Sequence, residues 1–303
     1  MDTTQPTNAP PANAPSMSPS NRPGNPPVSD EVLAIISEDG SNQPTVSRTV
    51  AHGEYDITSL TPASYNNAVH RDWIAHWARW AWAGRHIKKS DRILEPGCGR
   101  ETMLLKHMRT STAMVPSLYV GVDLDKIKFS DHREAKGKDI CPWAKLHQHF
   151  DFVTRLDELV ALYGEASFDK IVSFEVYEHI SPALGIEYLD ACHRMLAPGG
   201  TLFLSTPVFK GKKAANHIRE YTTDELRAII EDRGFTILDR FGTFASYHDV
   251  KKGIRAEYPD EAEAVLKLYE RAREFNSDNF LAGTLAPLIP DYSRNNVWLC
   301  TKA

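Results

Sequence analysis

The sequence has few cysteines, and none of them form a metal-binding pattern. Four cysteines, at positions 98, 141, 192 and 300, are scattered over 303 residues with no Cys-x-x-Cys pair. This spacing excludes a disulfide scaffold and the common zinc modules, and it is typical of a reducing cytoplasm. We therefore expect no metal site and a cytoplasmic location.

The chain also lacks long apolar runs and an excess of positive charge. No stretch approaches the ~18 consecutive apolar residues that a membrane-spanning helix needs, so we expect no membrane partner. Lys and Arg number 35 against 40 Asp and Glu, a net charge of −5, which argues against a general electrostatic nucleic-acid binder. A hydrophobic content of 42% leaves ample material for a globular core.

Aromatic residues are absent from residues 1–30, which instead contain eight of the 19 prolines. A segment with so little apolar area cannot offset the chain entropy lost on folding, so we predict a disordered tail here. The segment also lacks the basic start and apolar centre of a signal peptide. Both an unstructured leader and a partner-binding polyproline segment fit this composition.

A helical extension is predicted between the tail and the first strand, over residues 31–90. Its clearest helix lies within 65–87 and has apolar residues at helical spacing: Trp73, Ile74, Trp77, Trp80 and Ala81. Gly84 is a candidate for the helix end, and Trp82 falls off the apolar face. The helix either packs on a core or forms an aromatic wall over a substrate pocket.

From residue 91 onward, short apolar strands alternate with helices. We predict strands over 92–95, 118–125, 146–152, 168–176, 201–207, 236–244 and 295–302. Such alternation indicates an α/β fold with a mostly parallel sheet covered by helices on both faces. We therefore predict one catalytic domain over residues 91–303.

The residues that follow each strand are the candidates for a ligand site, because ligands of open α/β sheets bind outside the carboxyl ends of the strands. Two glycines, Gly97 and Gly99, follow the first strand and allow a tight turn and a close backbone approach to a ligand. Asp123 ends the second strand, where a carboxylate can accept both ribose hydroxyls of a nucleoside. A turn or cap role for this acid is the structural alternative.

The third and fourth strands end in further polar and aromatic residues. Asp151 and Phe152 follow the third strand, where a carboxylate can accept from an exocyclic amine and a ring can cover a purine face. The fourth strand leads into Glu175-Val176-Tyr177-Glu178-His179. Together, these strand ends favour one nucleoside-cofactor site.

The segments ILEPGCG, GVDLD, FDKIVSFEVYEHI, LAPGGTLFLSTP and HIREYTTDELRAIIEDRGF resemble the class I S-adenosylmethionine-dependent methyltransferases, particularly their small-molecule type 11/12-like branch. The resemblance covers about residues 90–245 and the last strand. It implies a Rossmann-like, doubly wound sheet of seven strands with an antiparallel last strand. It also implies S-adenosyl-L-methionine as the cofactor.

The resemblance implies a role for each matching residue. The methionine part of the cofactor would be wrapped by the first motif, Glu95, Gly97, Cys98 and Gly99. Asp123 would bind the ribose and Leu124 would lie along the adenine, which Asp151 and Phe152 would flank. Glu175 and Val176 would close the floor beneath the cofactor, and His179 would face the acceptor. The sequence departs from the family at Glu101, where a third glycine is usual.

Three residues are candidates for acid–base work at the acceptor. His179 is the first, because an imidazole titrates near neutral pH; a backbone hydrogen bond is its structural alternative. His217 and Tyr221 are second-rank candidates. Lys210, Lys212, Lys213 and Arg219 lie on the same loop, and they either hold an acidic group of the acceptor or form a solvated surface.

An insertion over residues 245–294 separates the last two strands, far longer than a common connection of about 2–6 residues. We predict a helix over 260–275 and an apolar segment over 280–290 that packs down. The insertion is either a cap over the acceptor pocket, with the Trp-rich helix as its neighbour, or a buttress without substrate contact.

The predicted function is methyl transfer to an oxygen or nitrogen of a small-molecule or sugar acceptor. A nucleic-acid methyltransferase is the alternative, supported by the basic loop 210–219 and the GRHIKKS stretch (84–90). A nicotinamide oxidoreductase would need a third glycine where Thr102 stands. A non-catalytic cofactor-binding scaffold is the last alternative, motivated by Glu101.

Overall fold

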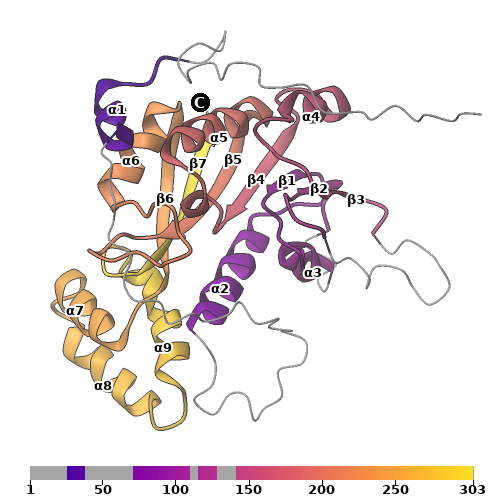
Figure 1. The fold of residues 1–303 in the computed structure, drawn as a ribbon. Coiled ribbons are helices and arrows are strands. Elements are labelled where there is room, and N and C mark those ends of the chain that lie inside the picture. The colour runs from indigo at the N-terminus through magenta and orange to yellow at the C-terminus, as the bar shows by residue number, and fades with distance from the viewer. Residues whose placement is uncertain (1–25, 38–70, 110–114, 128–140, 303) are drawn as a thin grey trace, which may run out of the picture.

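A computed structural model describes residues 26–37, 71–109, 115–127 and 141–302. Most of the predicted tail (1–25) and residues 38–70 of the predicted extension lie outside this part. Figure 1 shows a central sheet with helices on both sides and a separate group of helices at one end. No helix of the described residues is long and apolar enough to span a membrane.

The sheet has seven strands in the order β3-β2-β1-β4-β5-β7-β6. Its strands are β1 (Arg92–Pro96), β2 (Leu118–Val122), β3 (Ala144–His147), β4 (Phe168–Phe174), β5 (Leu196–Pro207), β6 (Phe235–Phe244) and β7 (Asn295–Lys302). β7 pairs antiparallel with β5 and β6, while the pairs among β1–β5 are parallel. The predicted α/β fold, with its antiparallel last strand, is confirmed. β3 is shorter than predicted and ends before Asp151.

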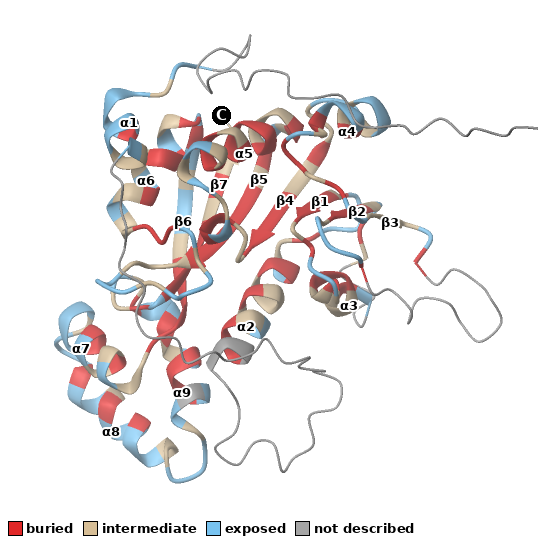
Figure 2. Cartoon of the chain, in the orientation of Figure 1, coloured by how far each residue is buried: buried red, intermediate tan, exposed pale blue. Residues whose placement is uncertain are grey.

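Alternation of side chains along the buried strands places apolar residues on both faces of the sheet. Leu94 packs in the larger core and its neighbour Ile93 in the smaller one. The larger core includes residues of α1 (Asp30–Ser37), α4 (Leu156–Tyr163), α5 (Pro182–Met195) and α6 (Thr223–Asp232), and the smaller core those of α2 (Arg71–Arg85) and α3 (Met103–Arg109). Figure 2 shows this buried interior along the strands.

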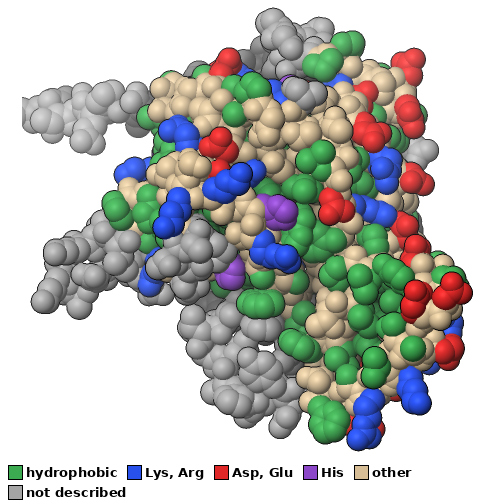
Figure 3. Space-filling model, turned by 180° about the vertical axis from the view of Figure 1, so that it is seen from behind, with side chains coloured by type: hydrophobic (Ala, Val, Ile, Leu, Met, Phe, Trp, Pro, Cys, Tyr) green, Lys and Arg blue, Asp and Glu red, His purple; other side chains and the backbone are tan. Residues whose placement is uncertain are grey.

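The insertion forms α7 (Tyr247–Glu257), α8 (Ala262–Ala272), α9 (Asp278–Leu285) and the 3-10 turn η6 (Ala286–Leu288). These elements share a small core of their own, which includes Val250, Leu266 and Ile289. A Cβ atom on Gly283 of α9 would lie 2.5 Å from Ile74 Cγ2, so α9 packs closely against α2. Figure 3 shows hydrophobic side chains gathered over the insertion, whose exposed apolar residues include Leu268 and Phe275.

Three details of the N-terminal prediction need correction. Residues 26–29, assigned to the disordered tail, contact the domain: the buried Arg233 side chain donates to the carbonyl oxygens of Pro26 and Pro27. Trp77 was placed on the buried face of its helix but is 49% exposed. Trp82 was placed off that face, yet its ring centroid lies 4.2 Å from that of Phe241.

Candidate functional site

The loop after β1 forms an open cradle at the carboxyl edge of the sheet. Gly97 and Gly99 both have positive φ angles, 74° and 71°, a conformation that side chains disfavour. A Cβ on Gly97 would lie 2.3 Å from Val176 Cγ2, whereas a Cβ on Gly99 would meet no atom within 4 Å. The loop is therefore closed on the side of Val176 and open at Gly99, as a backbone that receives a ligand requires.

Asp123 lies beside this cradle and is tied to it. Its Oδ2 accepts a 2.7 Å hydrogen bond from the Gly99 amide, and its Oδ1 accepts from the Asp125 amide. The carboxylate thus lies next to the open space at Gly99. This is where we expect a group that accepts hydrogen bonds from the ribose hydroxyls. The adjacent Leu124 is 67% exposed, so its apolar face is available to a ring.

Asp151 and Phe152, which follow the third predicted strand, lie in two different environments. Oδ1 of Asp151 accepts from the amides of Val153 and Thr154, which is a cap of the following turn. The Phe152 ring is buried and lies edge-on to Tyr188, with centroids 5.3 Å apart. Both residues therefore stabilise the segment before α4, and flanking of the adenine is a prediction that rests on the resemblance alone.

Glu95 is buried beneath the cradle rather than open to it. The Tyr119 hydroxyl donates to its carboxylate, and burial raises the pKa of Glu95 to about 8, although this hydrogen bond opposes the rise. Cys98 is also buried, its amide donates to the Val122 carbonyl, and burial raises the pKa of its thiol. These two side chains support the loop from below.

The raised pKa of Glu95 predicts a pH-dependent stability. Between pH 4.5 and about 8 the folded chain holds a proton that the unfolded chain has lost, so stability falls as pH rises through this window. Glu95→Gln removes this ionisation. We therefore expect the loss of unfolding free energy between the two pH values to be several kcal/mol smaller in this variant, at about 1.4 kcal/mol per pKa unit. Urea unfolding at pH 5 and pH 8 measures the difference.

The control for this experiment is Glu101→Gln, which changes a half-exposed carboxylate of the same loop. We expect this variant to keep the pH dependence of the unmodified chain. A decline with pH that is equally steep in Glu95→Gln and in the unmodified chain would show that Glu95 titrates normally.

Glu175 anchors a polar network drawn from four elements. Arg79 of α2 lies 3.2 Å from Glu175 Oε1, Ser205 of β5 donates to the same oxygen at 2.9 Å, and Asn295 of β7 donates to Oε2 at 2.9 Å. Arg79 also donates to Asn295 Oδ1 at 3.1 Å. Because β7 is antiparallel, its first residue lies at the same edge as the ends of β4 and β5.

The sequence prediction named Glu175 but missed its three partners. The signals were weak yet present. Arg79 is a charged residue that lies four positions from each of the small buried residues Ala75 and Ala83. Residues four apart share one face of a helix, so this spacing predicts that Arg79 is buried as well. Glu175 itself has a φ of 58°, a strained value for a residue with a side chain that often marks a functional site.

A short 3-10 turn after β4, η5 (Tyr177–His179), carries a second group of polar side chains. The Nε2 atom of His179 lies 3.9 Å from Glu178 Oε1, and the ring centroids of His179 and His217 are 4.9 Å apart. Burial raises the pKa of the Glu178 carboxyl well above its ordinary value, and the charge of Glu175 adds to the rise. The structure thus brings together two of the three predicted catalytic residues.

Tyr221, the third candidate, packs beneath η5 as a buried residue rather than beside the two histidines. It is 1% exposed and belongs to the larger core, where its ring centroid lies 5.6 Å from that of Tyr177. Burial also raises the pKa of its hydroxyl. Arg219, proposed to hold an acidic acceptor group, is buried and pairs with Glu225 at 2.8 Å. Both residues therefore order the loop before α6.

Comparison with known proteins gives the family. The model of a family described as a methyltransferase domain matches residues 65–240, more than half of the chain. The chain belongs to the class I S-adenosylmethionine-dependent methyltransferases. This membership confirms the resemblance, the Rossmann-like fold and the cofactor class. The match begins at residue 65, inside the segment predicted as an extension, and its range includes α2.

The matches to individual relatives cover less of the chain than the match to the family model. A probable S-adenosylmethionine-dependent methyltransferase of Mycolicibacterium smegmatis is 33% identical over 87 residues, 26% of this chain and 33% of that protein. A ubiquinone biosynthesis O-methyltransferase of Xanthomonas campestris is 31% identical over 145 residues, 46% of this chain and 49% of that protein. The chain thus spans between a third and a half of the length of these curated relatives.

A solved methyltransferase structure also has low sequence identity to this chain. The 1,6-didemethyltoxoflavin-N1-methyltransferase of Burkholderia thailandensis is 17% identical, with a TM-score of 0.49 over 86% of this chain and 94% of that one.

Glu101 stands where the resemblance leads us to expect a third glycine, and the structure shows where its side chain lies. Its Oε2 lies 2.9 Å from Lys106 Nζ of α3. The ion pair partly neutralises the carboxylate, which lowers the repulsion that it would exert on the cofactor's own carboxylate.

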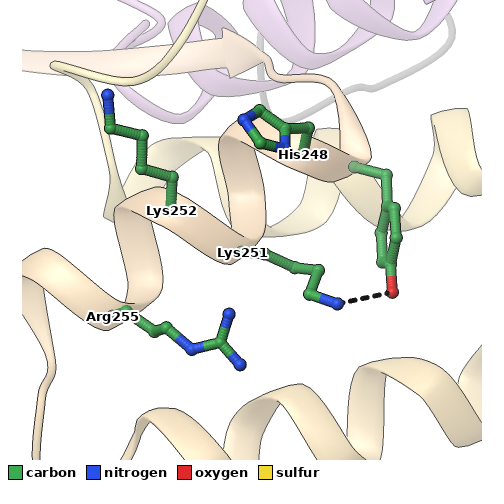
Figure 4. A pocket seen from close by; sticks show the side chains of 5 residues that line it. His248, Lys251, Lys252 and Arg255 are labelled. Carbon is green, nitrogen blue, oxygen red and sulfur yellow. Dashed lines mark hydrogen bonds between the residues drawn. The ribbon is translucent and has the colours of Figure 1, made fainter.

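A separate hollow of about 400 Å³ lies on α7 of the methyltransferase (Figure 4). Its lining is basic and comprises Tyr247, His248, Lys251, Lys252 and Arg255. Lys251 lies 3.8 Å from Glu270 and Arg255 lies 3.1 Å from Glu263, both on α8. Acidic residues of the insertion thus already balance part of this charge, and we assign no ligand to the hollow.

Proposed function

We propose that the chain transfers the methyl group of S-adenosylmethionine to an oxygen or nitrogen atom of a small-molecule or sugar acceptor. The observation that carries this proposal is the adjacency of two groups at one sheet edge. The open cradle of Gly97, Gly99 and Asp123 contacts Val176, and Val176 leads directly into η5 with its histidine. The names of the O-methyltransferase relatives support an acceptor of small size.

In this proposal the chain binds, aligns and excludes water. S-adenosylmethionine supplies an already activated methyl group, so alignment of the acceptor is the main task left to the protein. The cradle would hold the amino-acid part, Asp123 the ribose hydroxyls, and exposed Leu124 the adenine. The Arg79–Glu175–Asn295 network joins α2 and β7 to the end of β4, and in this proposal it would hold the floor of the site in place.

An oxygen acceptor also needs a base, and His179 is the residue that we propose for this role. Its Nδ1 lies 3.1 Å from the Asn216 carbonyl oxygen, a contact that fixes the proton on Nδ1 and leaves Nε2 with its lone pair. Nε2 is then the atom that would accept the acceptor's proton. We assign His217 to the same side of the site.

Asp123→Ala tests the ribose assignment. We expect cofactor affinity to weaken by about 1–3 kcal/mol, because the ribose hydroxyls lose their acceptor. Titration calorimetry with S-adenosylhomocysteine measures the change. Asp125→Ala, an exposed carboxylate two residues away, is the matched control and should bind as the unmodified chain does. Unchanged affinity in Asp123→Ala would contradict the ribose role.

His179→Ala separates the base role from cofactor binding. We expect turnover of an oxygen acceptor to fall by about 10²-fold or more, the usual contribution of a positioned base, with cofactor affinity unchanged. Methyl incorporation and calorimetry measure the two quantities. His248→Ala, an exposed histidine on α7, is the control. Equal losses of turnover and cofactor affinity would assign His179 to the cofactor site instead.

A further inference from the structure

We propose that Glu178, His179 and His217 form a binding site for one divalent transition-metal ion. One oxygen of Glu178 and one ring nitrogen of each histidine lie within 4.8 Å of one another. Ligands at about 2.0–2.2 Å from one ion are separated by up to about 4 Å, so small side-chain movements bring all three onto a single cation.

The buried carboxylate of Glu178 is the observation that points to a missing ligand. Its side chain is 1% exposed, and among the described residues neither of its oxygens has a hydrogen-bond partner. Buried carboxylates are normally paired, hydrogen-bonded or bound to a metal. A cation between Glu178 and the two histidines satisfies this requirement.

Both histidines are oriented for metal binding by their second ring nitrogens. Nδ1 of His179 faces the Asn216 carbonyl oxygen at 3.1 Å, and Nδ1 of His217 faces Glu220 Oε1 at 2.6 Å. A carbonyl or carboxylate on one nitrogen fixes the proton there and leaves Nε2 as the ligand, as in metal sites of known geometry. Glu220 also accepts from the Ala214 amide at 2.9 Å, which holds this carboxylate in place.

The chemistry of the three ligands favours a transition metal over magnesium or calcium. Two imidazoles and one carboxylate suit Zn²⁺, Mn²⁺ or Fe²⁺, whereas Mg²⁺ and Ca²⁺ prefer oxygen ligands throughout. His179 is exposed and His217 half-buried, so an ion has a path of entry. The site would replace our expectation that the chain binds no metal.

The metal also changes the role of His179. One nitrogen cannot bind a cation and accept a proton at the same time, so the metal-bound form would not use His179 as the base. Three protein ligands leave coordination positions for water or an acceptor oxygen, and a bound cation lowers the pKa of such an oxygen. This last step rests on the proposed function, whereas the metal site itself does not.

The test uses the full chain without a polyhistidine tag, with Co²⁺ as the probe. We expect one Co²⁺ per chain, with visible absorption bands of a nitrogen- and oxygen-bound ion, and at least tenfold weaker binding in Glu178→Gln and in His217→Gln. His248→Gln, on α7, should bind as tightly as the unmodified chain. Thermal unfolding without metal identifies any variant that fails to fold, and His217→Gln then decides, since His217 is not fully buried.

Two results would overturn the metal site: no Co²⁺ binding by the unmodified chain, or equal binding by the folded Glu178 and His217 variants. S-adenosylhomocysteine binding, measured on the same samples without metal, tests the proposed function separately. A chain that binds S-adenosylhomocysteine but no Co²⁺ loses only the metal site, and one that binds Co²⁺ but no S-adenosylhomocysteine loses only the proposed function.

Discussion

Arg79→Met is expected to lower the free energy of unfolding by about 3–5 kcal/mol, the usual cost of removing one partner from a buried ion pair. Arg79 is 1% exposed and contacts both Glu175 and Asn295. Methionine keeps most of the side-chain volume, so the loss reports the charge rather than a cavity. Urea unfolding measures it.

Arg271→Met is the matched control, because its ion pair with Glu274 is largely exposed and such pairs contribute at most about 1 kcal/mol. The double variant Arg79→Met/Glu175→Gln should recover part of the loss, since it removes the unpaired charge as well. Equal effects of the Arg79 and Arg271 variants would mean that the network does not hold α2 against the sheet.

Gly97→Ala is the second change with a large expected effect. The positive φ of 74° costs a side chain about 1–2 kcal/mol. The new Cβ would also lie 2.3 Å from Val176 Cγ2, an overlap that costs about 1–3 kcal/mol more. Because the loop must shift to relieve this contact, we expect both stability and S-adenosylmethionine affinity to fall.

Gly199→Ala provides the control for backbone strain. Gly199 has a φ of 70° and no atom within 4 Å of a built Cβ, and it lies at the opposite end of β5 from the site. This variant should show the strain cost without the overlap and without a loss of cofactor affinity. If both variants bind the cofactor equally well, the cradle does not depend on the Gly97–Val176 contact.

The alternation of strands and helices, and the ends of some strands, could be predicted from sequence. Apolar runs bounded by glycine, proline or acids predict β1, β4 and β7 to within two residues, and the ends of β1, β2 and β4 place Gly97, Asp123 and Glu175 at one edge. The periodicity of apolar residues and the residue types that form turns are local properties of the chain, so a single sequence contains enough information to find them.

Contacts between distant segments could not be predicted in the same way. The pairing of Arg79 with Glu175 and Asn295 joins positions 96 and 216 residues apart in the chain, and no local pattern encodes it. The sequence makes Phe152 and Tyr221 candidate site residues because each lies on a segment that follows a predicted strand, and the structure shows that both rings are buried in the larger core. Side-chain direction at a strand end depends on tertiary packing.

α7 is not among the helices predicted from sequence, although its sequence carries a clear helix-start signal. Ser246 and Asp249 form a capping box, and Val250 and Ile254 are buried one turn apart. Gly253 within the helix weakens the pattern, but a Cβ there would lie 2.9 Å from Ile289, the residue that follows η6, so this close packing requires the glycine. Tertiary contact here overrides helix propensity.

A crystal structure of the chain with S-adenosylhomocysteine tests the central claim most directly. We predict density for the ligand at the carboxyl edge of the sheet, with its ribose hydroxyls on the Asp123 carboxylate and its sulfur toward the space beside His179. Density for the ligand at another place, or a ribose that makes no contact with Asp123, would contradict the account.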